Sequence, residues 1–426
     1  MATFSKIWKN ADLRKRILFT LMIFIVYRLG SYIPVPTINT SVLEASAQTP
    51  MLGFIDTLSG GALKRFSLFA MSISPYITAS IIIQLLQMDV IPILSEWAKE
   101  GETGKRKLNQ LTRYVTLVFA FVQAITMAIG FDLMYGGVLL ESHSILTYLY
   151  IALTMTAGTA VMIFLADQIT SKGIGNGTSM IIVAGILSRV PYMLNDLYTK
   201  YLVNITLSNV LAFISVLALL LLTIIAVIYL QSATRKLPIQ YANRHNSAQL
   251  SGRKDSFIPL KLNSAGVIPV IFSVSLVSLP LTVVSFLPES GVTKWITTIF
   301  DYTQPIGFIL YVVLIVAFTY FYAFVQVSPE KVAENLKKQG SYIPGVRPGA
   351  DTEEYLSKVL SRITFIGAIY LVVIAGLPIL FGAITDLPSS VEIGGTSLLI
   401  VVGVAIETAK QIQTKTMDQK YRGFIK

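Results

Sequence analysis

Residues that could carry out catalysis or bind a metal are scarce in this sequence. It contains no Cys and only two His, His143 and His245, so it offers neither thiolate ligands nor a closely spaced His pair. Gly101 to Lys105 resembles a phosphate-binding loop only superficially, because four residues should separate the glycines and Ser or Thr should follow the lysine, where Arg106 stands. The sequence therefore predicts no catalytic residue, no metal and no cofactor, and any work driven by ATP must come from a partner protein.

The charged residues within apolar segments weaken a second hypothesis, an ion-coupled transporter of small solutes. Such a protein should keep ionisable groups near the middle of the membrane. Here Asp132, Asp167, Glu407, Arg28 and Arg189 lie toward the ends of their segments. We interpret each as an end-anchored or paired charge. The transporter stays open as an alternative, and an intramembrane enzyme has less support.

The elements that must position all these residues are membrane-spanning helices. The chain has 426 residues, of which 54% are apolar and only 13% charged, whereas soluble domains carry about 25% charged residues. A bilayer core about 30 Å thick requires about 20 apolar residues per helix, and ten such segments occur. Because five is odd, two sets of five spans would be inverted relative to each other, with a pathway at their interface. The spans lie near 17–35, 72–92, 114–134, 147–167, 178–197, 208–231, 265–287, 305–327, 362–382 and 395–412.

The positive charges indicate the orientation of these spans. With alternate loops on alternate sides, 28 of the 34 Lys and Arg fall on the side of the N-terminus. Cytoplasmic loops carry such an excess, so both termini are predicted to be cytoplasmic, and the net charge of +11 mainly reflects topology. Residues 1–33 resemble a secretory signal, but Arg28 interrupts the apolar run, so we expect a retained helix.

Two predicted cytoplasmic loops, 232–264 and 328–361, are longer than the roughly 2–8 residues typical of helix connections in bundles. Long ordered loops are expected to carry function. We divide the chain into the first five spans plus the sixth (1–231), a docking loop (232–264), spans seven and eight (265–327), a second docking loop (328–361), spans nine and ten (362–412) and a tail (413–426).

The segment before the second span is unusual. A short amphipathic piece, Asp56 to Phe66, contains Gly60 and Gly61, and the chain becomes apolar only after Ser72 and Pro75. Irregular backbone at membrane depth is tolerated only inside protein or beside water. The sequence therefore favours an interior position for this piece, with a helix lying on the outer membrane surface as the alternative.

Six sequence blocks resemble the SecY family, the channel-forming core subunits of the bacterial protein translocase. GGALKRFSLFAMSISPYITASIIIQLL (60–86) is similar to its first signature and QITSKGIGNGTSMIIVAGI (168–186) to its second. RKLPIQYANR, PLKLNSAGVIPVIF, GSYIPGVRPG and GGTSLLIVVGVAIET extend the resemblance along the chain. The resemblance implies ten helices in two inverted five-helix halves around a central pore, in the bacterial plasma membrane. This pore would open across the membrane for secreted chains and sideways, toward the lipid, for membrane helices.

The resemblance also assigns roles to residues, and each role has a plainer alternative. The pore ring matches Ile77, Ile81, Ile182, Ile186, Ile271 and Ile400, which would otherwise be packing or lipid-facing residues. The plug, a short helix beneath the ring, matches Asp56, Thr57, Leu58, Ser59, Gly60, Gly61, Ala62, Leu63, Lys64, Arg65 and Phe66, with a simple turn as the alternative. The lateral gate matches Gln84 and Gln87 opposite Ser273, Ser275 and Ser278, or these are ordinary helix packing.

The implied partners are SecE, SecG, the motor ATPase SecA, the ribosome through its RNA surface, unfolded preproteins with their signal sequences, and membrane lipid. Docking of SecA or the ribosome matches the cations of the two long loops, which would otherwise only set topology. These cations are Arg235, Lys236, Arg244, Arg253, Lys254 and Arg347.

Overall fold

Each of the ten predicted spans lies on a helix, which confirms the all-α membrane fold. The computed structural model describes residues 10–39, 56, 59–88, 90–140, 142–203, 206–241, 256–284, 290–385 and 389–423. The helices are α2 (Ala11–Gly30), α5 (Ser74–Leu86), α6 (Pro92–Lys99), α7 (Glu102–Met134), α8 (Ile145–Lys172), α9 (Gly177–Tyr201), α10 (Leu207–Ser232), α11 (Ile268–Val284), α12 (Gly291–Phe300), α13 (Pro305–Val327), α14 (Pro329–Lys338), α15 (Ala350–Thr385) and α16 (Ser389–Gly423). The strands are β1 (Thr234–Tyr241), β2 (Ser256–Lys261) and β3 (Ser341–Tyr342).

Among the described residues, six helices are long and apolar enough to cross a membrane: α7, α8, α9, α10, α13 and α15. Two further apolar helices, α5 and α11, are shorter. The second span was expected over 72–92, but α5 has only 13 residues. Pro75 occupies its first turn, where a missing N–H costs no hydrogen bond, and the chain before it runs in turns.

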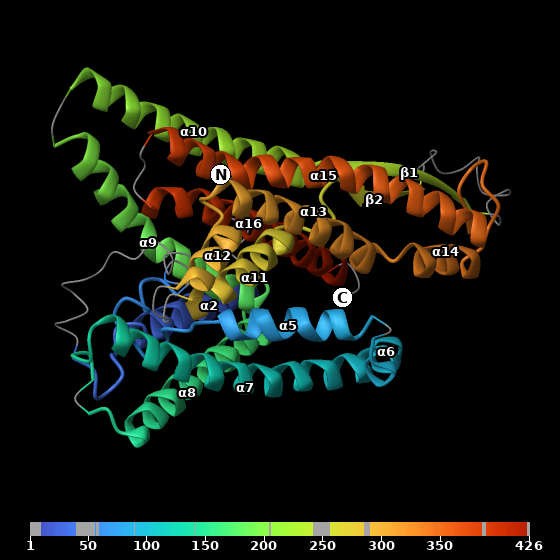
Figure 1. Ribbon diagram of the computed structural model, residues 1–426. Coiled ribbons are helices and arrows are strands. Elements are labelled where there is room, and N and C mark those ends of the chain that lie inside the picture. The colour runs from blue at the N-terminus through green and yellow to red at the C-terminus, as the bar shows by residue number, and fades with distance from the viewer. Residues whose placement is uncertain are drawn as a thin grey trace.

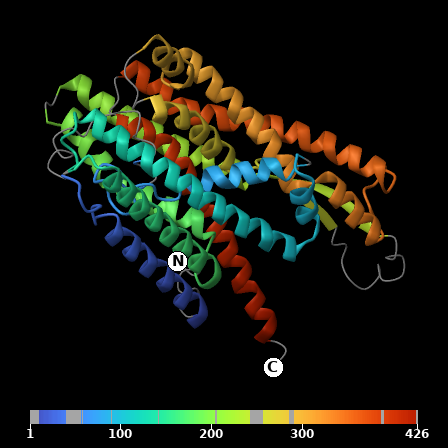
Figure 2. The same ribbon diagram turned by 60° about the horizontal axis from the view of Figure 1, so that its bottom comes forward.

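The bundle consists of two groups of five spanning helices that meet along a central interface (Figure 1). The first group is α2, α5, α7, α8 and α9, and the second is α10, α11, α13, α15 and α16. Between the groups, α9 packs against α16 and α5 packs against α11. Figure 2 shows the last part of α16 projecting beyond the bundle, near the end of the chain at which α2 begins.

One end of the bundle, which we call the turn end, holds the irregular segments 31–39 and 59–73. These two segments pair with each other: the Val35 N–H donates to the Phe66 carbonyl at 3.0 Å, and the Leu68 N–H donates to the Ile33 carbonyl at 2.9 Å. Their apolar side chains are buried together with residues of α7 and α8. The segment before the second span therefore lies inside the protein, as the sequence favoured.

At the opposite end, which we call the sheet end, the two long loops form one small domain (Figure 1). Strand β1 is central and pairs antiparallel with β2 from the first loop and β3 from the second. Helix α14 and the start of α15 cover it, so that Leu237, Leu260, Leu336 and Leu356 share a separate hydrophobic core. The two loops are thus one structural unit instead of two independent arms.

The strands were not among the predicted elements, although the sequence carries a signal for them. Leu237, Ile239 and Tyr241 alternate with polar or Pro residues in β1, and Ile258 and Leu260 alternate in β2. This period of two is typical of a half-buried strand. The membrane spans dominate the hydropathy of the chain, which hides a six-residue alternation.

We predict that Leu356→Ala destabilises the sheet-end domain by about 2–5 kcal/mol, because it removes a fully buried side chain and leaves a cavity. Limited proteolysis of the purified protein in its bilayer should then cut 232–264 and 328–349 faster. The matched control is Lys358→Ala, which removes an exposed, solvent-screened ion pair with Glu354. Equal cleavage rates for both variants would contradict the shared core.

Candidate functional site

The six isoleucines matched to the pore ring all lie in one buried apolar cluster between the two groups of helices. The exposed fraction of each side chain is between 1% and 8%. Ile77 and Ile81 come from α5, Ile182 and Ile186 from α9, and the other two from α11 and α16. Each pair is spaced i, i+4 and therefore shares one face of its helix.

The arrangement follows from the local sequence of the two helices that supply the pairs. Asn176 caps the start of α9 by accepting the Thr178 N–H at 3.1 Å, which fixes where the helical period begins. Gly177 lies so close to α8 that a Cβ there would be only 1.7 Å from the Ala166 carbonyl oxygen. Close packing of the α9 start against α8 thus fixes the position of Ile182 and Ile186 along the axis of the bundle.

Over residues 59–66, the segment matched to the plug differs from the helix predicted over Asp56 to Phe66. Asp56 is helical, but residues 59–66 form consecutive turns, and residues 57 and 58 lie outside the described residues. The reason is Gly60 and Gly61, which take φ values of 68° and 86°, a region that glycine favours at helix ends. The Gly61 N–H donates to the Asp56 carbonyl at 2.8 Å, as at a glycine C-cap.

The same turn is tightly packed. Ser59, Ala62, Leu63 and Phe66 are all buried. The Ser59 hydroxyl donates to the Asp56 carbonyl at 3.0 Å, and one carboxylate oxygen of Asp56 accepts the Lys64 N–H at 3.1 Å. From residue 59 onward, an ordered turn held by its own hydrogen bonds takes the place of the expected helix.

Among the described residues, the seam between α5 and the second group is closed mainly by apolar side chains, with a polar contact at Gln84. The Tyr322 hydroxyl of α13 donates to the Gln84 side-chain oxygen at 2.8 Å, and the Gln84 amide donates to Ser80 at 3.0 Å. The Phe272 ring of α11 packs edge-on against Tyr322, with 5.5 Å between centroids. Gln84 thus lies where α5 faces α13.

The serines expected opposite Gln84 behave differently. Ser273 and Ser278 are buried, and their hydroxyls donate to the Pro269 and Val274 carbonyls of their own helix, at 2.8 and 2.7 Å. Serine hydroxyls commonly bond one turn back in helices. Ser275 is half-buried on α11, and Gln87 is half-buried just after α5. The sequence analysis missed Tyr322, because a Tyr inside an apolar span carries no spacing signal of its own.

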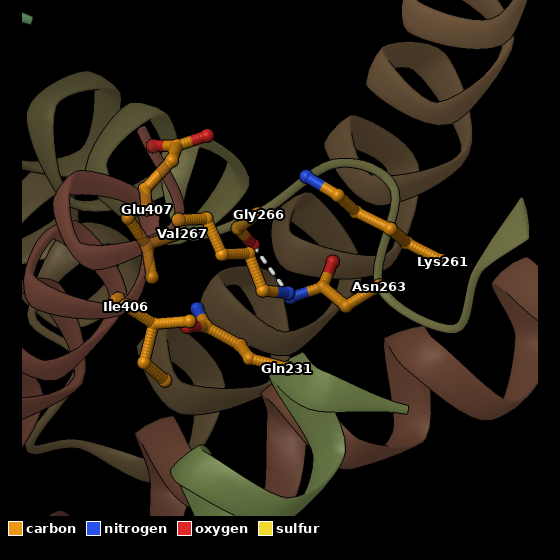
Figure 3. A pocket seen from close by; sticks show the side chains of 9 residues that line it. Gln231, Lys261, Asn263, Gly266, Val267, Ile406 and Glu407 are labelled. Carbon is orange, nitrogen blue, oxygen red and sulfur yellow. Dashed lines mark hydrogen bonds between the residues drawn. The ribbon is translucent and has the colours of Figure 1, made fainter. Parts of the chain in front are cut away.

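A small pocket of about 50 Å³ lies where α10, α11 and α16 meet at the sheet end (Figure 3). The Asn263 amide donates to the Gly266 carbonyl at 2.8 Å and fixes the turn that leads from β2 into α11. Lys261 and Glu407 lie at its rim. The volume is enough for a few waters, and the lining residues come from both the sheet-end domain and the bundle.

Of the six predicted docking cations, the structure describes three. Arg235 and Lys236 are exposed on β1, where the Lys236 ammonium lies 4.8 Å from the centre of the Phe257 ring. Arg347 is exposed in the turn between β3 and α15, and its carbonyl accepts the Thr352 hydroxyl at 2.7 Å. Arg244, Arg253 and Lys254 lie outside the described residues. The described three come from both long loops and belong to one domain.

Comparison with known proteins identifies relatives over the whole chain. The profile of the SecY family matches residues 67–409. "Protein translocase subunit SecY" of Bacillus licheniformis is 51% identical over 427 residues, covering 100% of this chain and 99% of its own length. The proteins of the same name from Bacillus subtilis and Staphylococcus aureus are 51% and 48% identical, and at least 99% of each chain is covered.

Solved structures share the fold at much lower identity. "The structure of a protein conducting channel" superimposes with a TM-score of 0.66 at 16% identity, covering 95% of this chain and 93% of that one. "Sec61 in the Canine ribosome-channel complex from the endoplasmic reticulum" gives a TM-score of 0.64 at 16% identity with the same coverage. A third match, with a TM-score of 0.63 and 17% identity, is described as a study of the plug domain that stabilises the closed state of SecY; it covers 95% of this chain and 93% of that one.

We predict that Gln84 and Tyr322 are energetically coupled. In a double-mutant cycle of Gln84→Leu and Tyr322→Phe, the coupling in the free energy of unfolding should be about 0.6 kcal/mol, the average for hydrogen bonds between membrane helices. The matched control cycle replaces Tyr322→Phe by Tyr320→Phe, two residues away on α13, and should give coupling near zero. Equal coupling in both cycles would show that the bond does not hold the seam.

Proposed function

The chain belongs to the SecY family of protein translocase subunits, and from this premise we propose how its residues work as a protein-conducting channel. It is the central pore-forming subunit, which passes unfolded secretory proteins across the bacterial plasma membrane and releases transmembrane helices sideways into the lipid. It performs no catalysis itself, and its partners supply the energy. The observation that carries this proposal is the gathering of six branched apolar side chains at the interface of the two helix groups.

These six side chains form the constriction of the pore. Bulky apolar groups from four helices leave a narrow passage that water wets poorly, and a dewetted passage resists ions. Dispersion contacts are individually weak, about 0.1–0.2 kcal/mol per atom pair, so the ring can part around an extended polypeptide and close behind it. The cluster contains side chains from both helix groups, so widening it requires only that the groups move apart.

The segment 56–66 is the plug that rests at the turn end, below the ring. Its burial and its internal hydrogen bonds support a fixed resting position, and its glycine turn separates it from the rigid helices on either side. A compact turn can leave as a unit, because the backbone hydrogen bond that ties its described residues to another segment joins Phe66 to Val35 of the segment 31–39 and not to a helix.

The lateral gate is the seam of α5 and α7 against α11 and α13. One hydrogen bond, Gln84 to Tyr322, and the rings of Phe272 and Tyr322 close it beside the ring. A hydrophobic transmembrane helix can replace apolar contacts of the same kind, whereas the single hydrogen bond is a small cost on opening.

The sheet-end domain is the cytoplasmic docking surface, and both termini are cytoplasmic. The excess of Lys and Arg on that side supports this orientation. Arg235, Lys236 and Arg347 present positive charge from one rigid unit, which suits ribosomal RNA phosphates or acidic side chains of SecA. SecE and SecG complete the complex within the membrane, preproteins with their signal sequences enter from this side, and lipid surrounds the helices.

The test of the channel is site-specific photocrosslinking to a secretory chain stalled during transport. Probes at Ile81 and Ile182 should crosslink to the stalled chain, because both side chains lie in the ring. The matched controls are Ile225 on α10 and Ile309 on α13, which are 66% and 63% exposed toward the surroundings of the bundle. Crosslinks from the controls alone, or solute counterflow without any partner, would contradict the channel.

The docking proposal predicts that Arg347→Glu reduces SecA-driven transport at least tenfold, because it reverses an exposed charge on the turn that faces the partner. The control is Lys338→Glu in the same domain. Its ammonium lies 2.7 Å from the Glu334 carboxylate, lowers the pKa of Glu334 and is already paired. Crosslinking at Arg347 with SecA and with ribosomes supplied separately identifies which partner binds there. If neither partner crosslinks, the docking assignment is wrong.

A further inference from the structure

Three arginines gather at the turn end, on the side where the chain carries few positive charges. Arg28 ends α2, Arg65 lies in the segment 56–66 and Arg189 lies on α9. The Arg28 and Arg65 guanidiniums lie 4.6 Å and 4.0 Å from the centre of the Tyr32 ring. The positive-inside rule gives no reason for cations here, so their contacts within the protein must explain them.

Arg189 pairs with the buried carboxylate of Asp56. The Arg189 guanidinium nitrogen lies 3.0 Å from the Asp56 carboxylate oxygen, and the exposed fractions of the two side chains are 21% and 2%. A carboxylate buried to this extent is stable only if it is paired and hydrogen-bonded. The Lys64 N–H occupies the other carboxylate oxygen at 3.1 Å. The Asp56 side chain is therefore held in place by α9 and by the backbone of its own turn.

Arg28, in the last turn of α2, binds the same turn from a second helix. One guanidinium nitrogen donates to the Gly60 carbonyl at 2.7 Å, and the other donates to the Tyr32 hydroxyl at 2.9 Å. That carbonyl belongs to the residue whose positive φ ends the helical turn at Asp56. Arg189 of α9 thus binds the turn at position 56, and Arg28 of α2 binds it at position 60.

The turn also lies directly against the backbone of α9. A Cβ at Gly60 would be 3.2 Å from the Gly185 Cα and carbonyl oxygen. Gly185 and Arg189 are four residues apart and share one face of α9. The ring residue Ile186 is three residues before Arg189, about 4.5 Å along the helix axis. The same helix therefore supplies part of the ring and the main anchor of the turn.

We infer that Arg189 and Arg28 are positioning residues that lock the segment 56–66 in the resting channel, with the Asp56 to Arg189 ion pair as the principal lock. The inference rests on the proposed role of that segment as the plug. Opening separates the pair, and water then solvates both charges, which offsets part of the lost attraction. The ion pair holds the segment 56–66 while that segment is packed against α9, and it breaks once the segment has moved away.

The first experiment measures ion leak through the resting complex, purified with its partner subunits and reconstituted in liposomes without SecA or ribosome. Arg189→Gln and Asp56→Asn should each increase the leak at least tenfold. The double variant should leak no more than the worse single variant, because both changes remove one interaction. Arg189→Lys, which keeps the charge, should restore most of the seal, and Arg28→Gln should give a smaller increase. The matched control Lys200→Gln, at the end of the same helix, should leave the leak unchanged.

The second experiment reads the position of the turn directly. The natural chain has no Cys, so Ser59→Cys introduces a single thiol at a buried position. A membrane-impermeant maleimide should label it slowly in the otherwise unchanged chain and at least tenfold faster when Arg189→Gln is added. Labelling rates that stay equal in both backgrounds would overturn the lock, even if Arg189→Gln lowers the yield of folded complex.

A third variant separates failure of the lock from failure of the plug. Replacing residues 57–65 by a short Gly-Ser linker removes the turn itself. If this deletion increases the leak while Arg189→Gln and Asp56→Asn do not, the plug is correct and the lock is wrong. If neither the deletion nor the substitutions change the leak, the proposed plug and the proposed ion-pair lock are both wrong.

Discussion

Every backbone N–H and C=O at membrane depth must find a partner inside the protein, because lipid offers none. Most of this chain meets the requirement with helices. The segments 31–39 and 59–73 meet it by pairing with each other and by burying their side chains against α7 and α8. The Gly60 carbonyl is satisfied by a guanidinium from α2 instead of a backbone donor. The segments 31–39 and 59–73, as far as the structure describes this end of the chain, are therefore irregular where neighbouring helices enclose them.

This constraint explains why apolar side chains dominate both the isoleucine ring and the seam between α5 and the second helix group. Backbone hydrogen bonds are satisfied within each helix, so in the described part of the chain the two helix groups meet mainly through apolar side chains. Apolar contacts have no preferred direction and can be exchanged for contacts with lipid or with another polypeptide. The single hydrogen bond of Gln84 with Tyr322 adds orientation to the seam without adding much strength.

The sequence predicted the parts of the fold that depend on composition along the chain. Ten apolar stretches gave ten helices, and the block matches gave residues that lie together although they are far apart in the sequence, such as Ile81 and Ile271. Contacts set by tertiary packing were not predictable. The turn at Gly60 depends on a left-handed backbone that a helix-forming pattern does not reveal, and Tyr322 and Arg28 became relevant only through partners more than 30 residues away. The β1 and β2 alternation was visible but is short compared with the spans around it.

Helix α15 connects the sheet-end domain to the bundle and can therefore transmit motion from one to the other. It runs for 36 residues from the sheet-end domain into the bundle and contains one internal proline, Pro378. Residues 350–377, before that proline, span about 42 Å at about 1.5 Å per residue. Its first turns share a core with β1 and α14, and its later turns pack against α13 and α16. A straight rod of about 42 Å that tilts by about 5° around one end moves the other end by about 4 Å. A protein that rotates the sheet-end domain slightly would therefore shift the helix walls by a distance comparable to the width of a polypeptide, with no signal passing through the pore.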